Sequence, residues 1–255
     1  MYKARFPIGE LLKLRKWSTP TIYNGWEQVT KMDRLNGTYN REPITDFMPQ
    51  MGPMVGYAVT FIIEPSNKTH IGSDPENKVR ATTALRKYIA ECPGPKIAVV
   101  QDLDKPNFIG CNWGEINAKI FRNLGCVGTI TDGSIRDLDE ITSVGFKCIA
   151  SQLCIGHGYN FPIRWDCEVE VFGCKVKPGQ LIHADKHGFI AVPFEDEKEL
   201  LQGSIFMDSV ECNTVATSSS SAAGKSFEQI LLEQEAADRE KDRLSIGKFG
   251  LKIGR

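Results

Sequence analysis

The fold of this chain is decided by residues 96–153, which read KIAVVQDLDKPNFIGCNWGEINAKIFRNLGCVGTITDGSIRDLDEITSVGFKCIASQL. Three apolar, β-branched runs predict buried strands, and two amphipathic segments between them predict helices. The strands are expected at 96–102, 126–133 and 146–153, and the helices at 115–125 and 137–145. Strands and helices that alternate at this spacing are typical of βαβ units with parallel strands. The sequence therefore predicts an α/β fold around a largely parallel sheet.

The flanking segments extend this core on both sides. Upstream, the apolar run 54–65 predicts another buried strand, and residues 77–91 predict an amphipathic helix. Downstream, residues 166–193 are short apolar runs separated by glycine-containing turns. Such punctuation is typical of β-hairpins, so we expect antiparallel strands there.

The chain divides into three parts by composition. Residues 1–200 are expected to form a single domain, and residues 201–225 a linker, because their second half is a low-complexity run of Ser, Thr and Ala. Residues 226–255 predict a charged helical tail with a thin apolar stripe. A stripe of this kind is usually covered by a neighbouring surface, which here could be another subunit.

Composition restricts the classes of function. Lysine and arginine (31) nearly balance aspartate and glutamate (32), so no overall basic field favours a nucleic acid partner. No apolar run approaches the roughly 20 residues of a membrane span, and none at the start suits a signal sequence. The eight cysteines include no C-x-x-C pair and are interpreted as reduced side chains of a cytoplasmic protein. A zinc site or a disulfide framework is the alternative.

The densest chemistry lies in the segment 112–137. Gly114 and Glu115 open the predicted helix at 115–125, whose first backbone N–H groups can bind a carboxylate or a phosphate. Arg136 and Asp137 follow the next strand, so both loops should meet at the carboxyl edge of the sheet. A guanidinium matches a carboxylate or an enolate oxygen, and a carboxylate suits a divalent cation that keeps several waters. These residues predict an anion and metal site.

Simpler interpretations exist for the same residues. Arg136 and Asp137 could be a local ion pair in which Asp137 caps the helix that follows. His157, in a glycine-flanked loop, could contact the distal end of a substrate or act as an acid–base group, or it could be bonded structurally. Trp113 could form a pocket wall or part of the core.

Two further groups invite a chemical interpretation. His183 and His187 flank Asp185, a spacing compatible with metal binding, but alternation along a strand favours a turn instead. Lys119 and Lys147 would permit a Schiff base, which we disfavour because neither lies in a visibly apolar sequence environment.

Several motifs together resemble the RraA-like family, which includes the class II 4-hydroxy-4-methyl-2-oxoglutarate aldolases. Its G-[DE]-x20-R-D signature is matched by Gly114-Glu115 and Arg136-Asp137. Residues 176–193, VKPGQLIHADKHGFIAVP, resemble the family's V-x-P-G-D-x-h-x-A-D-x-x-G-V stretch, in which h is apolar. Weaker matches occur at 18–26 and 56–60, and the similarity spans roughly residues 9–200.

The resemblance implies an α/β/β sandwich that assembles as a trimer or hexamer with active sites at subunit boundaries. In the aldolases the aspartate of R-D ligates Mg²⁺ or Mn²⁺ and the arginine contacts the pyruvyl part of the substrate, roles that fall to Asp137 and Arg136. Glu115 would hold metal-bound water, and the amides of Ile116 and Asn117 would bind the substrate carboxylate. The implied reaction is retro-aldol cleavage of a 4-hydroxy-2-oxo acid, or decarboxylation of oxaloacetate, through a pyruvate enolate.

This sequence departs from the family pattern at two points. Glu115 replaces the aspartate common in bacterial aldolases, and the acid that aldolases borrow from a neighbour's C-terminal region has as candidates here Glu233 and Glu235, which lie in a divergent tail. The family also includes a protein inhibitor of ribonuclease E that carries a similar pair of motifs. A non-catalytic, protein-binding regulator of an RNA-degrading enzyme is therefore the alternative function, and related enolate chemistry on sugar acids is a third.

Overall fold

The computed structural model describes residues 6–74, 76–213 and 222–250. Its contacts separate into two compact units. The first contains the residues up to Thr19 and Gly37–Phe194, and the second contains Pro20–Asn36 and the chain from Glu195 onward. The predicted domain 1–200 differs from this division at residues 20–36 and 195–200, which belong to the second unit.

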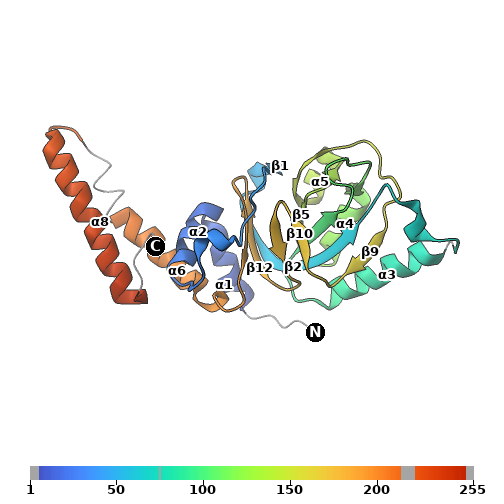
Figure 1. Ribbon diagram of the computed structural model, residues 1–255, viewed down its shortest axis with the longest axis horizontal. Helices are drawn as coiled ribbons and strands as arrows, with labels where there is room; N and C mark the ends of the chain where they lie inside the picture. Colours follow the sequence, from blue (N-terminus) through green and yellow to red (C-terminus); the bar gives the residue numbers. More distant parts are fainter. Residues whose placement is uncertain (1–5, 75, 214–221, 251–255) are drawn as a thin grey trace. The chain divides into compact units, whose positions relative to one another are not determined.

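An eight-stranded sheet forms the centre of the first unit (Figure 1). Its four inner strands run parallel: β2 (Met54–Ile63), β3 (Lys96–Asp102), β5 (Cys126–Thr131) and β7 (Lys147–Ala150). Antiparallel strands extend it on both sides: β1 (Thr45–Asp46), β9 (Pro162–Trp165), β12 (Leu181–Asp185) and β13 (Gly188–Val192). The predicted α/β class and the parallel centre of the sheet are confirmed.

The two faces of the sheet are covered by different layers. Three helices pack on one face: α3 (Glu76–Glu91), α4 (Glu115–Asn123) and α5 (Leu138–Val144). A hairpin of β10 (Val169–Val171) and β11 (Cys174–Val176) packs on the other. Alternation along β3 divides the two cores, because Ala98 and Val100 face the helices while Ile97 and Val99 face the hairpin. The result is the expected α/β/β sandwich.

A second, three-stranded parallel sheet stands beyond the carboxyl ends of the inner strands. It consists of β4 (Cys111–Trp113), β6 (Ser134–Ile135) and β8 (Gln152–Leu153), in that order. The predicted strand 126–133 ends early, at Thr131, and the predicted strand 146–153 is broken at Ser151 into β7 and β8. Ser151 stabilises one break, since its backbone N–H donates to Gly133 O (3.1 Å) and its hydroxyl to Asp132 O (2.7 Å). Three neighbouring parallel strands now end at one edge.

The first turns of the chain are anchored by the H-x-D-x-H motif. The structure begins with α1 (Ile8–Lys13) and η1 (Leu14–Lys16). The ring of His183 is buried. Its Nε2 lies 3.1 Å from Leu14 O, and its Nδ1 lies 2.9 Å from Thr19 Oγ1. Asp185 accepts from the Thr19 and His187 backbone N–H groups, both at 2.9 Å. Burial lowers the pKa of His183 to about 4, which keeps the ring neutral.

The second unit is helical. It contains α6 (Glu197–Asn213), α8 (Phe227–Phe249) and most of α2 (Thr19–Glu27). Helices α2 and α6 approach closely at two glycines, because a Cβ on Gly203 would lie 2.2 Å from Gly25 O. The Trp26 indole donates to Asp196 Oδ2 (2.8 Å). Short 3-10 turns complete the fold: η2 (Arg34–Asn36), η3 (Pro49–Met51) and η4 (Lys68–Ile71).

The predicted linker is wrong over residues 201–213, which are part of α6. The Ser- and Ala-rich run dominated that prediction, whereas apolar residues at helical spacing, such as Met207 and Val210, pack against α8. Most of the low-complexity run, 214–221, lies outside the described residues. The C-terminal helix is confirmed, and its N-terminal Ser226 forms a capping box with Gln229. Cover of α8 by a neighbouring subunit stays a prediction.

Among the described residues, no helix combines the length and apolar character needed to cross a membrane.

A buried ion pair joins β7 to β1. Lys147 and Asp46 each expose 2% of their side chains, with Nζ 2.5 Å from Asp46 Oδ2 and 3.0 Å from Met48 O. The sequence-based statement that Lys147 lacks an apolar setting is therefore wrong, because strand β7 carries it into the interior. Its ammonium is held by protein oxygens, so it serves structure and not Schiff-base chemistry.

We expect Asp46→Asn to lower the free energy of unfolding by about 3 kcal/mol, because it leaves a buried ammonium without a counter-charge. The double variant Asp46→Asn/Lys147→Met should recover most of this loss. Urea denaturation measures both. As a control, Glu42→Gln removes the exposed partner of Lys105 and should change stability by less than about 1 kcal/mol. Equal effects of the two single variants would contradict the prediction.

Candidate functional site

A cavity of about 250 Å³ opens where β4, β6 and β8 end. All seven residues predicted for the site line it: Gly114, Glu115, Ile116, Asn117, Arg136, Asp137 and His157. The first four follow β4, the arginine and aspartate follow β6, and the histidine lies in the loop after β8. The common edge of three parallel strands is the physical reason that they meet.

Asp137 caps a helix, but not the one that follows it. The residue holds the N-cap position of α5 without a side-chain hydrogen bond to that helix. Its Oδ2 instead accepts from the Glu115 N–H at the start of α4, at 3.1 Å. The backbone of Asp137 is left-handed (φ 56°, ψ 50°), a conformation that costs about 1 kcal/mol outside glycine. The predicted cap of the following helix is wrong, because this turn aims the carboxylate back at α4.

Arg136 is held from two sides. Its Nη1 donates to Ile155 O (3.0 Å) in the loop after β8, and its Nε lies 3.6 Å from Asp137 Oδ2. The two side chains remain 36% and 34% exposed, so this ion pair lies at the cavity and is not buried in the core. The guanidinium has further N–H groups with which to bind an anion.

Gly114 allows this approach. A Cβ at this position would lie 2.6 Å from Asp137 Oδ2 and 3.2 Å from Arg136 Nε. The backbone of Gly114 is extended (φ −152°), a conformation that any residue adopts. Glycine is needed here because a side chain would leave no space for Asp137 and Arg136. The first residue of the G-[DE] motif therefore makes room for the carboxylate and the guanidinium of the R-D motif.

The start of α4 presents unpaired donors to the cavity. The N–H of Glu115 donates to Asp137 Oδ2. The first hydrogen bond along the helix runs from the Ala118 N–H to Gly114 O (3.0 Å). The amides of Ile116 and Asn117 have no acceptor among the described residues. Free amides at the positive end of a helix dipole favour a carboxylate or a phosphate.

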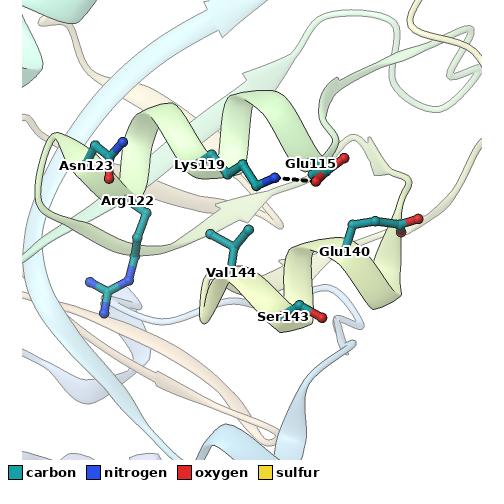
Figure 2. Close-up of a pocket in the computed structure, with 7 residues that line it drawn as sticks. All are labelled: Glu115, Lys119, Arg122, Asn123, Glu140, Ser143 and Val144. Atoms are coloured by element: carbon teal, nitrogen blue, oxygen red, sulfur yellow. Dashed lines mark hydrogen bonds and ion pairs between the residues drawn. The ribbon is translucent and has the colours of Figure 1, made fainter.

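Glu115 borders two cavities. Its carboxylate pairs with Lys119 one turn along α4, on the side of a second cavity of about 560 Å³ between α4 and α5 (Figure 2). Glu140 on α5 lies on the other side of that cavity. Glu115 also lines the smaller cavity beside Asp137. To hold a water near Asp137, its side chain must turn away from Lys119.

His157 has a defined tautomer. Its Nδ1 lies 3.0 Å from Gly158 O, and because a carbonyl oxygen can only accept, Nδ1 carries the proton. In the neutral ring, Nε2 is then an acceptor, on an exposed side chain that lines the cavity. This geometry suits a group that receives a proton from a ligand.

Trp113 belongs to the core. It is 1% exposed, and its ring centroid lies 4.8 Å from that of Phe121 and 5.0 Å from that of Phe146. The alternative role as a pocket wall is wrong, because this side chain packs against Phe121 and Phe146 in the core, whereas Cys111 and Asn112 line the cavity.

Four further residues that line the cavity were not predicted from the sequence: Lys78, Cys111, Asn112 and Asn160. Asn112 Nδ2 and Asn160 Oδ1 are buried and have no partner among the described residues. Asn112 adjoins the predicted motif and Asn160 follows His157 closely, so proximity in sequence was a usable signal. Lys78 comes from α3, which no local pattern connects to the site.

The donor set fits a hard divalent cation. Asp137 Oδ1 has no hydrogen bond among the described residues, and Glu115 supplies a second carboxylate on the same cavity. No cluster of three or more His, Cys, Asp or Glu side chains suited to an ion occurs in the described part of the chain. A sparse oxygen set is what Mg²⁺ or Mn²⁺ uses when water and substrate complete its coordination.

Two buried carboxyls lie beneath the site. Asp102 ends β3 and is 1% exposed, and its backbone N–H donates to Oδ1 of Asp132 (3.0 Å), which follows β5 and is 2% exposed. Asp102 Oδ2 has no partner, and a Cβ on Gly133 would lie 2.6 Å from it. Burial raises the pKa of Asp102 to about 7 and that of Asp132 to about 6.

The profile of the RraA-like family, described as Aldolase/RraA, matches residues 19–191. The chain belongs to the RraA-like family. This family includes both aldolases and regulators of ribonuclease E.

Individual relatives are distant. Protein DlpA of Legionella pneumophila is 23% identical over 172 residues, a match that covers 66% of this chain but only 25% of DlpA. Two solved structures share the RraA fold. An uncharacterized protein from Pseudomonas syringae has a TM-score of 0.67 at 17% identity, over 91% of this chain and 97% of its own. RraAS2 of Streptomyces coelicolor is described as an unusual member of the RNase ES inhibitor RraA protein family. Its structure has a TM-score of 0.65 at 19% identity, and the match covers 83% of this chain and 98% of RraAS2.

The Asp102 carboxyl predicts a pH dependence for this RraA-like protein. Its pKa is raised on folding, so between pH about 4 and about 7 the folded state binds more protons than the unfolded state. Stability from this group is therefore full at low pH and is lost as the pH rises through 7. In Asp102→Asn, the free energy of unfolding relative to wild type should improve by roughly 2–4 kcal/mol between pH 4 and pH 8.

Denaturation in urea at a series of pH values measures this difference. Asp139→Asn, at an exposed aspartate on α5, is the control and should follow wild type. Parallel curves for Asp102→Asn and wild type would show that Asp102 ionises normally.

Proposed function

We propose that this RraA-like protein is a divalent-metal-dependent lyase that cleaves a 4-hydroxy-2-oxo acid to pyruvate, and that it also decarboxylates oxaloacetate. One observation carries the proposal. The Arg136 guanidinium, the free Oδ1 of Asp137 and the unpaired amides of Ile116 and Asn117 surround one cavity. This set can bind a carboxylate and stabilise negative charge on a neighbouring oxygen at the same time.

The substrate carboxylate is assigned to the start of α4. The amides of Ile116 and Asn117 donate to it, and the helix dipole favours its charge. Arg136, oriented by Ile155 O and Asp137, then donates to the 2-oxo oxygen. As the C3–C4 bond breaks, this oxygen becomes an enolate oxygen, and the hydrogen bond from the guanidinium strengthens.

A bound Mg²⁺ or Mn²⁺, held by Asp137 with Glu115 close to its waters, would supply Lewis-acid polarisation of the 2-oxo group. The proton of the 4-hydroxyl needs an acceptor at the far end of the substrate. His157 Nε2 is the acceptor that we propose, since Gly158 O fixes the proton on Nδ1. In oxaloacetate, carbon dioxide leaves instead and no hydroxyl proton is transferred, so Arg136 has the same task and His157 accepts no proton. In both reactions carbon C3 of the enolate then takes a proton from water, which gives pyruvate.

We also propose that the site is completed in a homo-oligomer, a trimer or a hexamer. Large apolar side chains are exposed on the segments around the cavity: Ile109 (60%), Ile116 (71%), Leu153 (49%), Ile155 (94%) and Tyr159 (47%). An apolar rim around a polar cavity is typical of a protein interface. A second copy of this chain is the partner that closes the site.

The test is pyruvate release from 4-hydroxy-2-oxo acids and from oxaloacetate with Mg²⁺ or Mn²⁺. Asp137→Asn and Arg136→Lys should each lower kcat/KM by about 100-fold or more, because each removes a group that stabilises developing charge. EDTA should abolish turnover, and added metal should restore it. Asp139→Asn is the matched control and should retain activity. Turnover that persists in EDTA or in Asp137→Asn would exclude the mechanism.

The regulator alternative predicts a different result. A protein-binding inhibitor would capture an RNA-degrading enzyme at physiological salt, and it would show no lyase activity with any 2-oxo acid or metal. Capture should then survive Asp137→Asn, since a metal ligand inside a cavity contributes little to a protein surface.

Gly114→Ala tests the geometry of the site. The new Cβ must displace Asp137 or Arg136, so kcat/KM should fall by about 100-fold while the melting temperature changes little. Gly9→Ala is the control, because a Cβ on that helical glycine meets no atom within 4 Å. Wild-type activity in Gly114→Ala would show that the close approach to Asp137 is not needed.

A further inference from the structure

Two cysteine thiols share one acceptor at the rim of the candidate site. Cys111, in β4, is 2% exposed and lines the cavity, whereas Cys154 directly follows β8 and is partly exposed. The Cys154 thiol donates to Gly156 O, with Sγ at 3.2 Å. Cys111 Sγ lies 3.3 Å from Trp113 O and 3.5 Å from the same Gly156 O, so its single S–H is shared between these two carbonyls. Burial, and then the neighbouring Cys154 thiol, raise the pKa of Cys111. The two sulfurs are therefore neighbours.

The loop after β8 explains their approach. Strand β6 lies between β4 and β8, and Cys154 N–H donates to Ile135 O (2.9 Å) at the end of β6, so the contact with β4 is made by the residues that follow. Just before β4, a Cβ on Gly110 would lie 2.5 Å from the carbonyl carbon of His157. The segment Gly110–Cys111 is thus packed directly on the 154–158 loop.

The same loop controls two groups of the site. Ile155 O holds the Arg136 guanidinium, and His157 brings its ring to the cavity. Any change in the position of residues 154–158 therefore moves the arginine's acceptor and the histidine together. In the reduced protein, the Cys154 thiol bonded to Gly156 O, with the Cys111 thiol shared between Gly156 O and Trp113 O, stabilises this arrangement of the loop.

We propose that Cys111 and Cys154 form a reversible dithiol–disulfide couple that reacts with low-molecular-weight disulfides and inactivates the site when oxidised. The effect on activity rests on the proposed lyase function, whereas formation of the bond does not. Neither cysteine belongs to the G-[DE] or R-D motif, so the couple is a property of this chain beyond those motifs.

The chemistry is thiol–disulfide exchange. The accessible Cys154, as thiolate, attacks a small disulfide RSSR, which gives a Cys154–SR mixed disulfide and releases one RSH after protonation. Cys111 loses its proton to solvent and attacks the Cys154 sulfur, which releases the second RSH. The two cysteines lose two electrons and two protons, and RSSR gains them. Gly156 O then loses both S–H donors, and the loop is tied to β4.

The experiment uses the full chain, reduced and then equilibrated with glutathione and glutathione disulfide, followed by alkylation and peptide mapping. We expect a Cys111–Cys154 cross-linked peptide that disappears with dithiothreitol. Cys154→Ser should leave Cys111 reduced, and Cys111→Ala should stop at a glutathione adduct on Cys154. Cys167→Ser, at another partly buried cysteine, is the control and should form the cross-link.

Two measurements test the effect of oxidation on the loop and on the site. Hydrogen exchange of residues 154–158 should differ between the reduced and oxidised forms, and pyruvate release should fall about tenfold on oxidation and recover on reduction. Absence of the cross-linked peptide at every glutathione ratio would overturn the proposal, as would a cross-link that leaves exchange of the loop unchanged. A reduced protein without lyase activity would refute the proposed function, while the peptide map and the exchange data would still decide on the couple.

Discussion

The candidate site depends on the hydrogen bond from the Glu115 N–H to Asp137 Oδ2. It joins the loop after β6 to the first turn of the helix after β4, and so links the two halves of the G-[DE] and R-D signature. The bond requires a left-handed backbone at Asp137 and the absence of a side chain at Gly114. It occupies one carboxylate oxygen and one helix amide, which leaves Oδ1 and the next two amides available to a ligand. The conformational strain at Asp137 is offset by a charge-assisted hydrogen bond at the positive end of α4.

The rest of the fold supports this arrangement from below. The inner strands of the sheet are interrupted after Asp102 and Asp132 and near Ser151, and the chain continues as the small parallel sheet β4-β6-β8. Each interruption is bridged by polar groups that are buried, including two carboxyls with raised pKa values. Polar groups buried at this depth are costly unless they are paired or protonated. These buried groups stand where β3 and β5 end and the chain continues toward β4 and β6, which lead to the site.

The third loop sets the orientation of the charged groups. Ile155 O fixes the Arg136 guanidinium and Gly158 O fixes the tautomer of His157, so backbone carbonyls of one short segment orient two side chains. Glu115 is different, because its carboxylate is bonded to Lys119 and faces a second cavity. The site thus combines fixed groups, Asp137 and Arg136, with one acid that must change rotamer to take part. That contrast agrees with the family motif, in which the R-D pair is constant and the acid of G-[DE] varies.

The sequence alone determined the α/β class and the parallel inner strands, because periodicity in 96–153 depends only on local pattern. The motifs and the family resemblance also named seven residues that line one cavity in the structure, and their roles there stay predictions. The tertiary structure decided the rest. It placed the Asp137 cap on α4 instead of α5, since the partner of the carboxylate is set by the packing of the loop after β6 against the start of α4. It turned Trp113 inward, buried Lys147 against Asp46 and extended a helix over the predicted linker at 201–213. It also brought Lys78 to the cavity and Cys154 close to Cys111, because contacts between residues distant in sequence are set by packing, which no local pattern records.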